Sequence, residues 1–253
     1  MAGTLFPNPY AVVVIGAGSG IGRAAAEHIA SSGVMVGCVD RDAAGAADTA
    51  RRISEAGGSA VSAAADVADE ASIGEAVTRL ASEVGRIHGL VNCAGITGRT
   101  NVKAHEVDVA DFDAVYRVNL LGALLVSKAV LPHMLAHGYG RILHVASIAG
   151  KEGNAGMAAY SATKAGLIGL VKSMAKDYAE TGITINALAP AVIRTPLVDA
   201  LPQETVDYMT ARIPMRRCGT LEEAAELIQW IVSPACSFTT GFTFDLSGGR
   251  ATY

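Results

Sequence analysis

The chain has 253 residues, of which 51% are hydrophobic and only 5% aromatic, and its formal net charge is −4 at pH 7. The absence of a basic cluster argues against nucleic acid or an anionic membrane surface as a partner. The start of the sequence does not resemble a signal peptide, and the apolar runs look too short to span a bilayer, so we expect a cytoplasmic protein. The four cysteines have no CxxC spacing and the histidines no metal-ligand spacing, which predicts reduced thiols and no metal site.

The first predicted elements are a strand, a tight turn and a helix. A β-branched run over 11–15 is followed by Gly16, Gly18, Gly20 and Gly22 and then by an alanine-rich helical stretch. Glycines allow the backbone to approach a pyrophosphate closely, and the free N–H groups at a helix start attract phosphate. The strand before and the helix after are the context that a dinucleotide-binding motif requires.

A second predicted strand, 34–39, ends in Asp40. A carboxylate at this position can accept hydrogen bonds from the adenosine ribose hydroxyls and repels a 2′-phosphate. Position 17 inside the glycine turn is alanine rather than a basic residue, although Arg41 follows the carboxylate. These residues favour NAD over NADP.

Strands and helices alternate through the rest of the chain. We expect helices over 43–56, 68–84, 111–135, 157–181 and 221–232, and strands over 60–65, 88–92, 141–146, 183–188 and 242–245. Such alternation requires right-handed crossovers, which predicts a single α/β domain over 1–253. Its fold would be a Rossmann-type doubly wound parallel sheet of about seven strands with helices on both faces, binding ligands beyond the carboxyl ends of the strands.

The predicted helix 157–181 carries Tyr160 and Lys164, four positions apart and therefore on one face. A phenol has a pKa of about 10, and a fixed ammonium one turn away should lower that pKa. Ser147, at the end of strand 141–146, could hydrogen-bond a substrate oxygen whose charge changes. Together these groups suit moving a proton on or off an alcohol or carbonyl oxygen, although the Tyr–Lys pair alone is more typical of a solvated helix face.

In order and spacing, these motifs resemble those of the short-chain dehydrogenase/reductase family over nearly the whole chain. The resemblance rests on the glycine turn, on the stretch Asn92-Cys-Ala-Gly95, on Asp66-Val67 and on the catalytic set Asn119, Ser147, Tyr160 and Lys164. It implies hydride transfer between C4 of a nicotinamide and the carbon that bears the oxygen. Tyr160 would be the general acid/base, Lys164 would lower its pKa and hold the nicotinamide ribose, and Ser147 would orient the substrate oxygen. Asn119, otherwise an ordinary polar helix residue, would hold a water that links Lys164 to solvent.

The same resemblance implies a set of cofactor-binding residues. They are Gly16, Ser19, Gly20, Ile21, Asp40, Arg41, Asp66, Val67, Asn92, Ala94, Gly95, Tyr160, Lys164, Pro190, Val192, Ile193 and Thr195. Two positions depart from the family pattern. Ile15 stands where a threonine is common, and Ala191 replaces the glycine of a Pro-Gly pair, which narrows the backbone conformations allowed near the nicotinamide.

The segment after Ser147 is polar, which favours a small hydroxylated substrate over a lipid. Lys151, Asn154, Arg194 and Arg250 are candidate substrate residues, because a cation near the reacting carbon could bind a carboxylate; each cation could equally be a solvated surface charge. The segments 150–157 and 189–196 and the C-terminus are similar to bacterial dehydrogenases of 2-keto-3-deoxy sugar acids. That similarity implies NAD-dependent oxidation of the 4-hydroxyl of 2-keto-3-deoxy-L-fuconate or L-rhamnonate.

Three alternatives remain open at this point. A 3-oxoacyl-thioester reductase shares the chemistry but usually favours NADPH, against which Asp40 argues. Another polyol or cyclic-alcohol dehydrogenase is excluded by no residue. A dinucleotide-binding protein without turnover is disfavoured by the intact catalytic set.

Small residues on helices 111–135 and 157–181, together with the apolar segment 238–246, suggest a homotetramer like those common in the family. These residues could also merely fit the helices to their own sheet. The tail 247–253 has too few apolar groups to form a core element. Because C-terminal segments lie at a subunit interface in tetramers of the family, we expect an ordered tail that helps enclose an anionic substrate.

Overall fold

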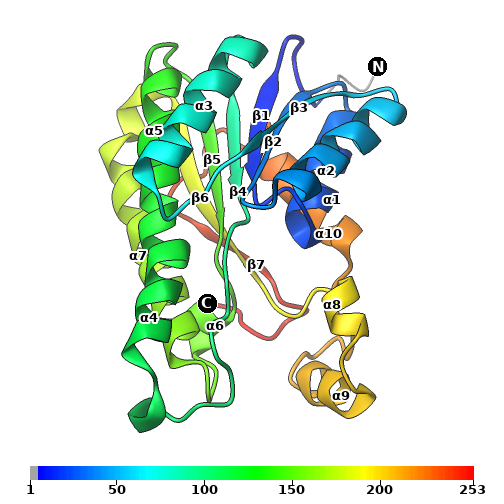
Figure 1. Cartoon of the computed structure of the whole chain (residues 1–253), viewed down its shortest axis with the longest axis vertical. Coiled ribbons are helices and arrows are strands. Elements are labelled where there is room, and N and C mark those ends of the chain that lie inside the picture. The colour runs from blue at the N-terminus through cyan, green and yellow to red at the C-terminus, as the bar shows by residue number, and fades with distance from the viewer. Residues whose placement is uncertain (1–4) are drawn as a thin grey trace.

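A computed structural model describes residues 5–253, apart from the side chains of residues 196 and 197. Residues 1–4, the first of the predicted domain, lie outside the described residues. Within the described part, the strands form a parallel seven-stranded sheet in the order β3-β2-β1-β4-β5-β6-β7 (Figure 1). This order confirms the predicted Rossmann-type sheet, in which the chain runs outward from β1 to one edge and then returns through β4 to the other.

The central strands are buried because both of their faces are covered. The strands are β1 (Ala11–Ile15), β2 (Met35–Asp40), β3 (Ser59–Ala64), β4 (Gly89–Asn92), β5 (Gly140–Val145), β6 (Ile183–Pro190) and β7 (Thr243–Leu246). Every residue of β1, β4, β5 and β6 is buried, as expected for apolar strands inside a parallel sheet. The edge strand β7 is only half-buried.

Helices cover the two faces of the sheet and form two hydrophobic clusters with it. One face is covered by α1 (Gly20–Ser31), α2 (Ala43–Glu55) and α10 (Leu221–Ile231); the other is covered by α3 (Glu70–Val84), α4 (Val109–Tyr116), α5 (Gly122–Leu135) and α7 (Ala158–Asp177) (Figure 1). Asp42, Asp69, Asp108 and Thr220 each accept a first-turn backbone N–H, which fixes where α2, α3, α4 and α10 begin.

The predicted helix 111–135 is not a regular α-helix throughout. A π-helical turn, Arg117–Leu121, separates α4 from α5. The whole stretch Val109–Leu135 is long and apolar enough to cross a membrane, so the expectation that every apolar run is too short is wrong for this helix. Half of its most apolar window is buried inside the protein, where it packs against α3 and the sheet, so it is a core helix.

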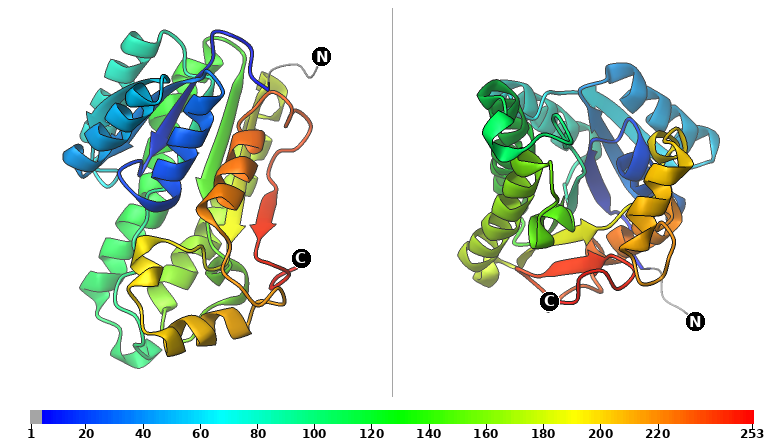
Figure 2. Two further views of the ribbon diagram at one scale, coloured as in Figure 1. Left: turned by 90° about the vertical axis from the view of Figure 1, so that its right-hand side faces the viewer. Right: turned by 90° about the horizontal axis from the view of Figure 1, so that it is seen from below.

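Several short elements lie beyond the carboxyl ends of the strands (Figures 1 and 2). They are α6 (Ala149–Glu152), α8 (Pro196–Asp199) and α9 (Gln203–Ala211). The sequence analysis predicts no helix at any of these three places. In α6 only Ala149 is buried and in α9 no residue is, so neither segment shows a helical repeat of apolar residues. Short 3-10 turns occupy Ala104–Glu106 and Ala179–Thr181.

Candidate active site

A cavity of about 720 Å³ opens at the carboxyl ends of β1, β2 and β4. The glycine turn forms its floor, and two of the glycines are required by close contacts. A Cβ on Gly16, whose φ is +78°, would lie 2.9 Å from the backbone nitrogen of Ala94, and a Cβ on Gly22 would lie 2.0 Å from the carbonyl oxygen of Gly16. The turn therefore presents bare backbone at the start of α1, which fits the pyrophosphate of a dinucleotide.

Most of the predicted cofactor residues line this cavity. Those that do are Gly16, Ser19, Gly20, Ile21, Asp40, Arg41, Asp66, Val67, Ala94, Gly95 and Thr195. Asn92, Tyr160, Lys164, Pro190, Val192 and Ile193 do not line it. Among the lining residues that sequence reasoning missed are Arg23, Glu27, Arg52 and Cys93. Arg23 and Glu27 lie four positions apart on α1, so the helical repeat that begins at the glycine turn was a signal that could have found them.

Asp40 is held against the glycine turn. Its Oδ2 accepts a hydrogen bond from the backbone nitrogen of Gly18 at 2.8 Å, and its Oδ1 accepts from that of Asp42 at 2.9 Å. Arg41 beside it is exposed. The Asp40 carboxylate at the end of β2 is therefore fixed in position, whereas the side chain of Arg41 is not.

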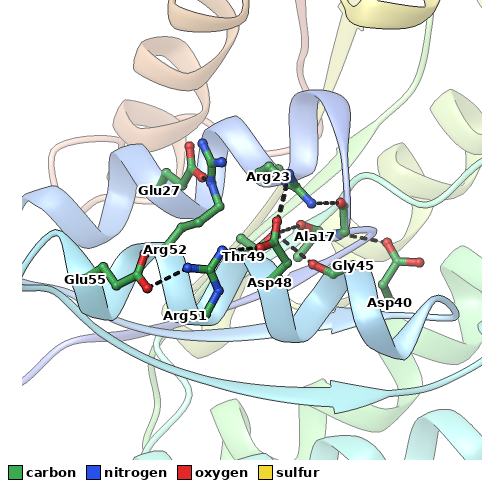
Figure 3. Close-up of polar contacts among 11 residues, drawn as sticks. Ala17, Arg23, Glu27, Asp40, Gly45, Asp48, Thr49, Arg51, Arg52 and Glu55 are labelled. Carbon is green, nitrogen blue, oxygen red and sulfur yellow. Dashed lines mark hydrogen bonds and ion pairs between the residues drawn. The ribbon is translucent and has the colours of Figure 1, made fainter.

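Arg23 of α1 and Thr49 of α2 together brace the glycine turn (Figure 3). The Arg23 guanidinium donates to the carbonyl oxygen of Gly18 at 2.6 Å and to Thr49 Oγ1 at 3.1 Å. The buried Thr49 hydroxyl donates to the carbonyl oxygen of Ala17 at 2.8 Å, and Asp48 pairs with Arg23 at 3.2 Å. These contacts hold two carbonyl groups of the turn in place.

Gly95 connects the cavity to the predicted catalytic residues. A Cβ added to it would lie 3.2 Å from Lys164 Nζ and 3.3 Å from Asn119 Oδ1. Lys164 donates to the carbonyl oxygen of Val145 at 2.7 Å, and its Nζ lies 5.8 Å from the centre of the Tyr160 ring. The structure thus brings Lys164 of α7 and Asn119 of the π-helical turn next to Gly95, which lines the cavity, and Tyr160 lies one turn before Lys164 on α7.

Asn119 sits in the π-helical turn and is buried. Its Oδ1 accepts from the backbone nitrogen of Ile96 at 2.8 Å, and its Nδ2 donates to the carbonyl oxygen of Ile96 at 2.9 Å and to Thr163 Oγ1 at 3.2 Å. A π turn inserts one extra residue into a helix, so it changes which side chains face inward. Here it directs an amide into the segment that borders the cavity.

Burial controls the proton affinities at this site. It raises the pKa of Tyr160 above its usual value, while a hydrogen bond with Ser147 acts in the opposite direction. Burial also lowers the pKa of Lys164 to about 8, with Cys93 opposing that change. The sequence predicts that Lys164 lowers the Tyr160 pKa; in the structure the net direction is upward, because burial is the larger of the two causes and the Ser147 hydrogen bond the smaller.

The predicted substrate cations already have partners in the structure. Lys151 pairs with Asp245 at 2.8 Å, Arg194 with Asp199 at 2.7 Å, and Arg250 with Glu152 at 2.8 Å. The side chains of Lys151 and Arg250 are only 8% and 9% exposed. Both cations therefore lie in ion pairs with carboxylates of this chain, and their role as substrate residues stays a prediction.

The C-terminal tail is ordered against its own protomer. Arg250 also donates to Asn154 Oδ1 at 2.9 Å, and the Tyr253 hydroxyl donates to the carbonyl oxygen of Lys151 at 2.7 Å. The backbone N–H of Asn154 in turn donates to Ser161 Oγ at 3.0 Å. The tail thereby fastens the segment between Ser147 and Tyr160.

The segment after β6 leads to Thr195, which lines the cavity. Pro190 ends β6 and accepts from the backbone nitrogen of Ile148 at 3.0 Å, whereas Ile193 forms a parallel bridge with Gly219. Ala191 is not among the described non-glycine residues with positive φ, so the alanine is accommodated without backbone strain. Among residues 5–253, no group of three or more His, Cys, Asp or Glu side chains could hold a metal ion.

Comparison with known proteins places this geometry in a class. A family model described as enoyl-(acyl carrier protein) reductase matches residues 16–251. A 2-dehydro-3-deoxy-L-rhamnonate dehydrogenase (NAD(+)) from Sphingomonas sp. (strain SKA58) is 42% identical over 99% of this chain and 100% of its own length. A cis-4-hydroxycyclohexanecarboxylate dehydrogenase from Sinomonas cyclohexanicum is 42% identical over 94% of each chain. The solved structure of levodione reductase superposes with a TM-score of 0.91 at 32% identity, covering 96% of this chain and 98% of that one.

The chain belongs to the short-chain dehydrogenase/reductase family. It is an NAD(P)-dependent oxidoreductase that acts on CH–OH groups of small molecules.

Proposed function

We propose that the enzyme oxidises, with NAD, the 4-hydroxyl of a 2-keto-3-deoxy sugar acid such as 2-keto-3-deoxy-L-rhamnonate or L-fuconate, and that it does so in the cytoplasm. The observation that carries this proposal is the full-length similarity to the Sphingomonas dehydrogenase, at 42% identity. A second relative at the same identity also acts on a hydroxylated carboxylate. Both similarities support a small anionic substrate with a secondary hydroxyl.

NAD is proposed as the cofactor because of the fixed charge of Asp40. Two backbone N–H groups hold its carboxylate at the rim of the cavity. A 2′-phosphate close to this carboxylate would be repelled, whereas ribose hydroxyls could donate to it. The glycine turn would hold the pyrophosphate, and the bound nicotinamide would accept the hydride from the substrate carbon.

The protein's own residues would manage the proton. Tyr160 would accept the proton of the substrate hydroxyl as its O–H bond breaks. Ser147, which forms a hydrogen bond with Tyr160, would orient the same substrate oxygen. Lys164 lies deep beside them and would stabilise the phenolate once it forms. Asn119 would keep the backbone of Ile96 in place next to Lys164, and the predicted water link to solvent would start from this amide.

Of the three cations expected near the substrate, one is better suited than the others to bind its carboxylate. Lys151 and Arg250 have carboxylate partners, and the Arg194 side chain is 68% exposed with Asp199 beside it. We therefore propose that Arg194, which follows the nicotinamide segment and has the least buried ion pair of the three, is the cation that can exchange its partner for the substrate. Asn154 remains a candidate for a substrate hydroxyl.

The alternative within the family is an acyl-thioester reductase, which the description of the matching family model favours. The polar segment after Ser147 and the carboxylate of Asp40 oppose it. A cyclic-alcohol dehydrogenase is the other alternative, supported by the Sinomonas relative.

One assay separates these functions. Initial rates of NADH formation should be measured with 2-keto-3-deoxy-L-rhamnonate, 2-keto-3-deoxy-L-fuconate, cis-4-hydroxycyclohexanecarboxylate and a 3-hydroxyacyl thioester, each with NAD and NADP. We expect the highest kcat/KM for a sugar acid, with at least about a tenfold preference for NAD, or roughly 1.4 kcal/mol. The highest kcat/KM for the thioester, or equal rates with NADP, would contradict the proposal, and Asp40→Ala should narrow the gap between the two cofactors.

A further inference from the structure

A buried histidine that takes no part in the chemistry lies between the cofactor cavity and the core. His144 is on β5, where it pairs with Asn92 of the neighbouring strand β4, and it is fully buried. Its Nδ1 lies 3.1 Å from Asn92 Nδ2, and its Nε2 lies 2.9 Å from Ser127 Oγ. Ser127 is also fully buried, and its hydroxyl donates to the carbonyl oxygen of Ala123 at 2.8 Å. These contacts form a continuous chain of hydrogen bonds that runs from α5 across β5 to the end of β4.

The positions of the hydrogen atoms in this hydrogen-bond chain follow from the groups at its two ends. The backbone N–H of Ala94 can only donate, so the side-chain oxygen that it contacts at 3.2 Å is Oδ1 of Asn92. The Nδ2 group of Asn92 therefore faces His144 and donates, which requires a bare Nδ1. At the other end, the single hydrogen of Ser127 is directed to Ala123, so Ser127 Oγ accepts from His144. The histidine must carry its proton on Nε2.

The charge of the ring is also determined by its surroundings. Burial, followed by the nearby charge of Lys164, lowers the pKa of His144 to about 3. A protonated ring would turn a second N–H toward Asn92 and break the chain. His144 is therefore a neutral ring with one fixed donor and one fixed acceptor.

The Asn92 amide is connected to the cofactor cavity through the turn that follows it. Ala94 and Gly95 line the cavity, and that turn packs tightly on both sides. On one side, Gly16 has no room for a Cβ against Ala94; on the other, Gly95 approaches Lys164 Nζ. A rotation of the Asn92 amide would release the N–H of Ala94 and shift this turn between its two neighbours.

We infer that His144 is a positioning residue for the cofactor, which acts in its Nε2-protonated form by fixing the Asn92 amide and, through it, the turn 93–95. The role differs from that of a core residue that only stabilises the fold. The positioning role predicts that cofactor affinity depends on the hydrogen bond that His144 Nδ1 accepts and not on the contact at His144 Nε2.

The variants His144→Leu, His144→Asn and Ser127→Ala separate these two roles. Leucine removes the acceptor, whereas the Oδ1 of an asparagine at position 144 can occupy the place of Nδ1 and accept from Asn92. Ser127→Ala removes a bond to the same ring but leaves the contact with Asn92. The probe is NADH, titrated by its fluorescence into each full-length protein without substrate, beside a thermal unfolding curve, so the result does not depend on the identity of the substrate.

We expect His144→Leu to raise the Kd for NADH on the order of tenfold, because a buried donor loses its acceptor. His144→Asn should restore most of that affinity, and Ser127→Ala should lower thermal stability with the Kd within about twofold of the wild type. Wild-type NADH affinity in His144→Leu would overturn the inference. So would a loss of affinity in Ser127→Ala as large as that in His144→Leu.

Nitrogen-15 NMR of the histidine rings in the unmodified protein provides a second test, which does not depend on the cofactor affinity of any variant. We expect two such histidines, His88 and His144, each with a bare Nδ1 and a protonated Nε2 and neither titrating between about pH 5 and pH 8, because the Ala11 N–H donates to His88 Nδ1 at 3.0 Å and burial lowers the pKa of both rings. His144 would be assigned by the loss of its signal in His144→Asn. A protonated Nδ1, or titration within that range, would overturn the inference.

Discussion

Lys164 is an ammonium group buried at the edge of the active site, only 3% exposed, and its pKa falls from the usual 10.5 to about 8. Between these two values the unfolded chain binds a proton that the folded protein has released, so this group makes the folded state more stable as pH rises. Below about pH 8 both states bind the proton, and burial of the charge costs stability. The full difference is roughly 3 kcal/mol, at about 1.4 kcal/mol for each tenfold change in the acid constant.

We therefore predict that Lys164→Met has a different pH dependence of stability from the wild type. From about pH 7 to about pH 10, the free energy of unfolding of the wild type should rise relative to that of the variant, by up to about 3 kcal/mol. Urea unfolding of both proteins at several pH values measures this difference, and subtracting the two curves removes the other titrating groups. A difference that stays constant over this range would show that Lys164 keeps an ordinary pKa.

Tyr160 provides the second prediction at this scale. Tyr160→Phe keeps the ring and removes the ionisable oxygen, so kcat should fall by roughly two to four orders of magnitude. NADH affinity should stay close to that of the wild type, because this residue does not line the 720 Å³ cavity. Steady-state kinetics and an NADH titration on the same preparation check both parts. Near-normal turnover would remove Tyr160 from the proton transfer.

At the scale of elements, the contact between α1 and α2 holds the glycine turn. Thr49→Val preserves the shape of the side chain and removes the hydroxyl that links Arg23 to the carbonyl oxygen of Ala17 (Figure 3). We expect it to lower the free energy of unfolding by about 1–3 kcal/mol, because buried polar groups lose their partner. The Kd for NADH should rise as well. Arg51→Ala is the matched control.

Arg51 lies two residues further along α2 and forms exposed ion pairs with Asp48 and Glu55. Exposed pairs of this kind contribute little to stability, so Arg51→Ala should leave both measurements unchanged. Equal effects of the two substitutions, measured by thermal unfolding and NADH fluorescence, would show that α2 does not act through the turn.

The sequence predicted the layers of the fold better than the details of the site, for physical reasons. The strands are buried on both faces and the helices on one face. This burial requires apolar residues at regular positions, and the sequence shows that repeat. The helix α9 has no fully buried residue, and its sequence therefore carries no such period. The π turn around Asn119 results from contacts with Ile96, 23 positions away, which local propensity does not contain.

The ion pairs were missed for a related reason. Lys151 and Asp245 are 94 positions apart, and Arg250 and Glu152 are 98 apart. Only the folded chain brings these charges together, so each cation looked free in the sequence. In contrast, the glycine turn and the Tyr160–Lys164 spacing are local patterns that the sequence shows directly, and residues of the glycine turn line the cavity.

At the scale of the whole molecule, we propose that the protein assembles as a homotetramer through the outer face of α7. An added Cβ at Gly169 would meet no atom within 4 Å, whereas one at Gly166 would meet Leu120 at 2.8 Å. Gly166 is therefore explained by packing within the protomer, and Gly169 is not. Exposed apolar residues on the neighbouring helices, including Val109 at 80% exposure, support an interface on this side.

We predict that Gly169→Leu folds normally and weakens assembly, because the protomer has room for the side chain and a closely packed neighbour would not. Light scattering should give about four times the 25.9 kDa chain mass for the wild type and a smaller mass for the variant at micromolar concentration. Gly169→Ala, which adds only a methyl group, is the control. A monomeric wild type would refute the tetramer, and a tetrameric Gly169→Leu would move the interface elsewhere.

The fastening of the tail to the segment after Ser147 limits how the specificity of this enzyme can evolve. Lys151 and Asp245, like Arg250 and Glu152, are pairs in which a nearly buried cation depends on one carboxylate. Losing one partner leaves a buried charge unpaired, which destabilises a protein far more than losing both. A new substrate preference that requires a change at 151 or 152 must therefore arrive together with a compensating change near the C-terminus. Directed evolution that mutates the two segments as one library should reach variants that single-segment libraries cannot.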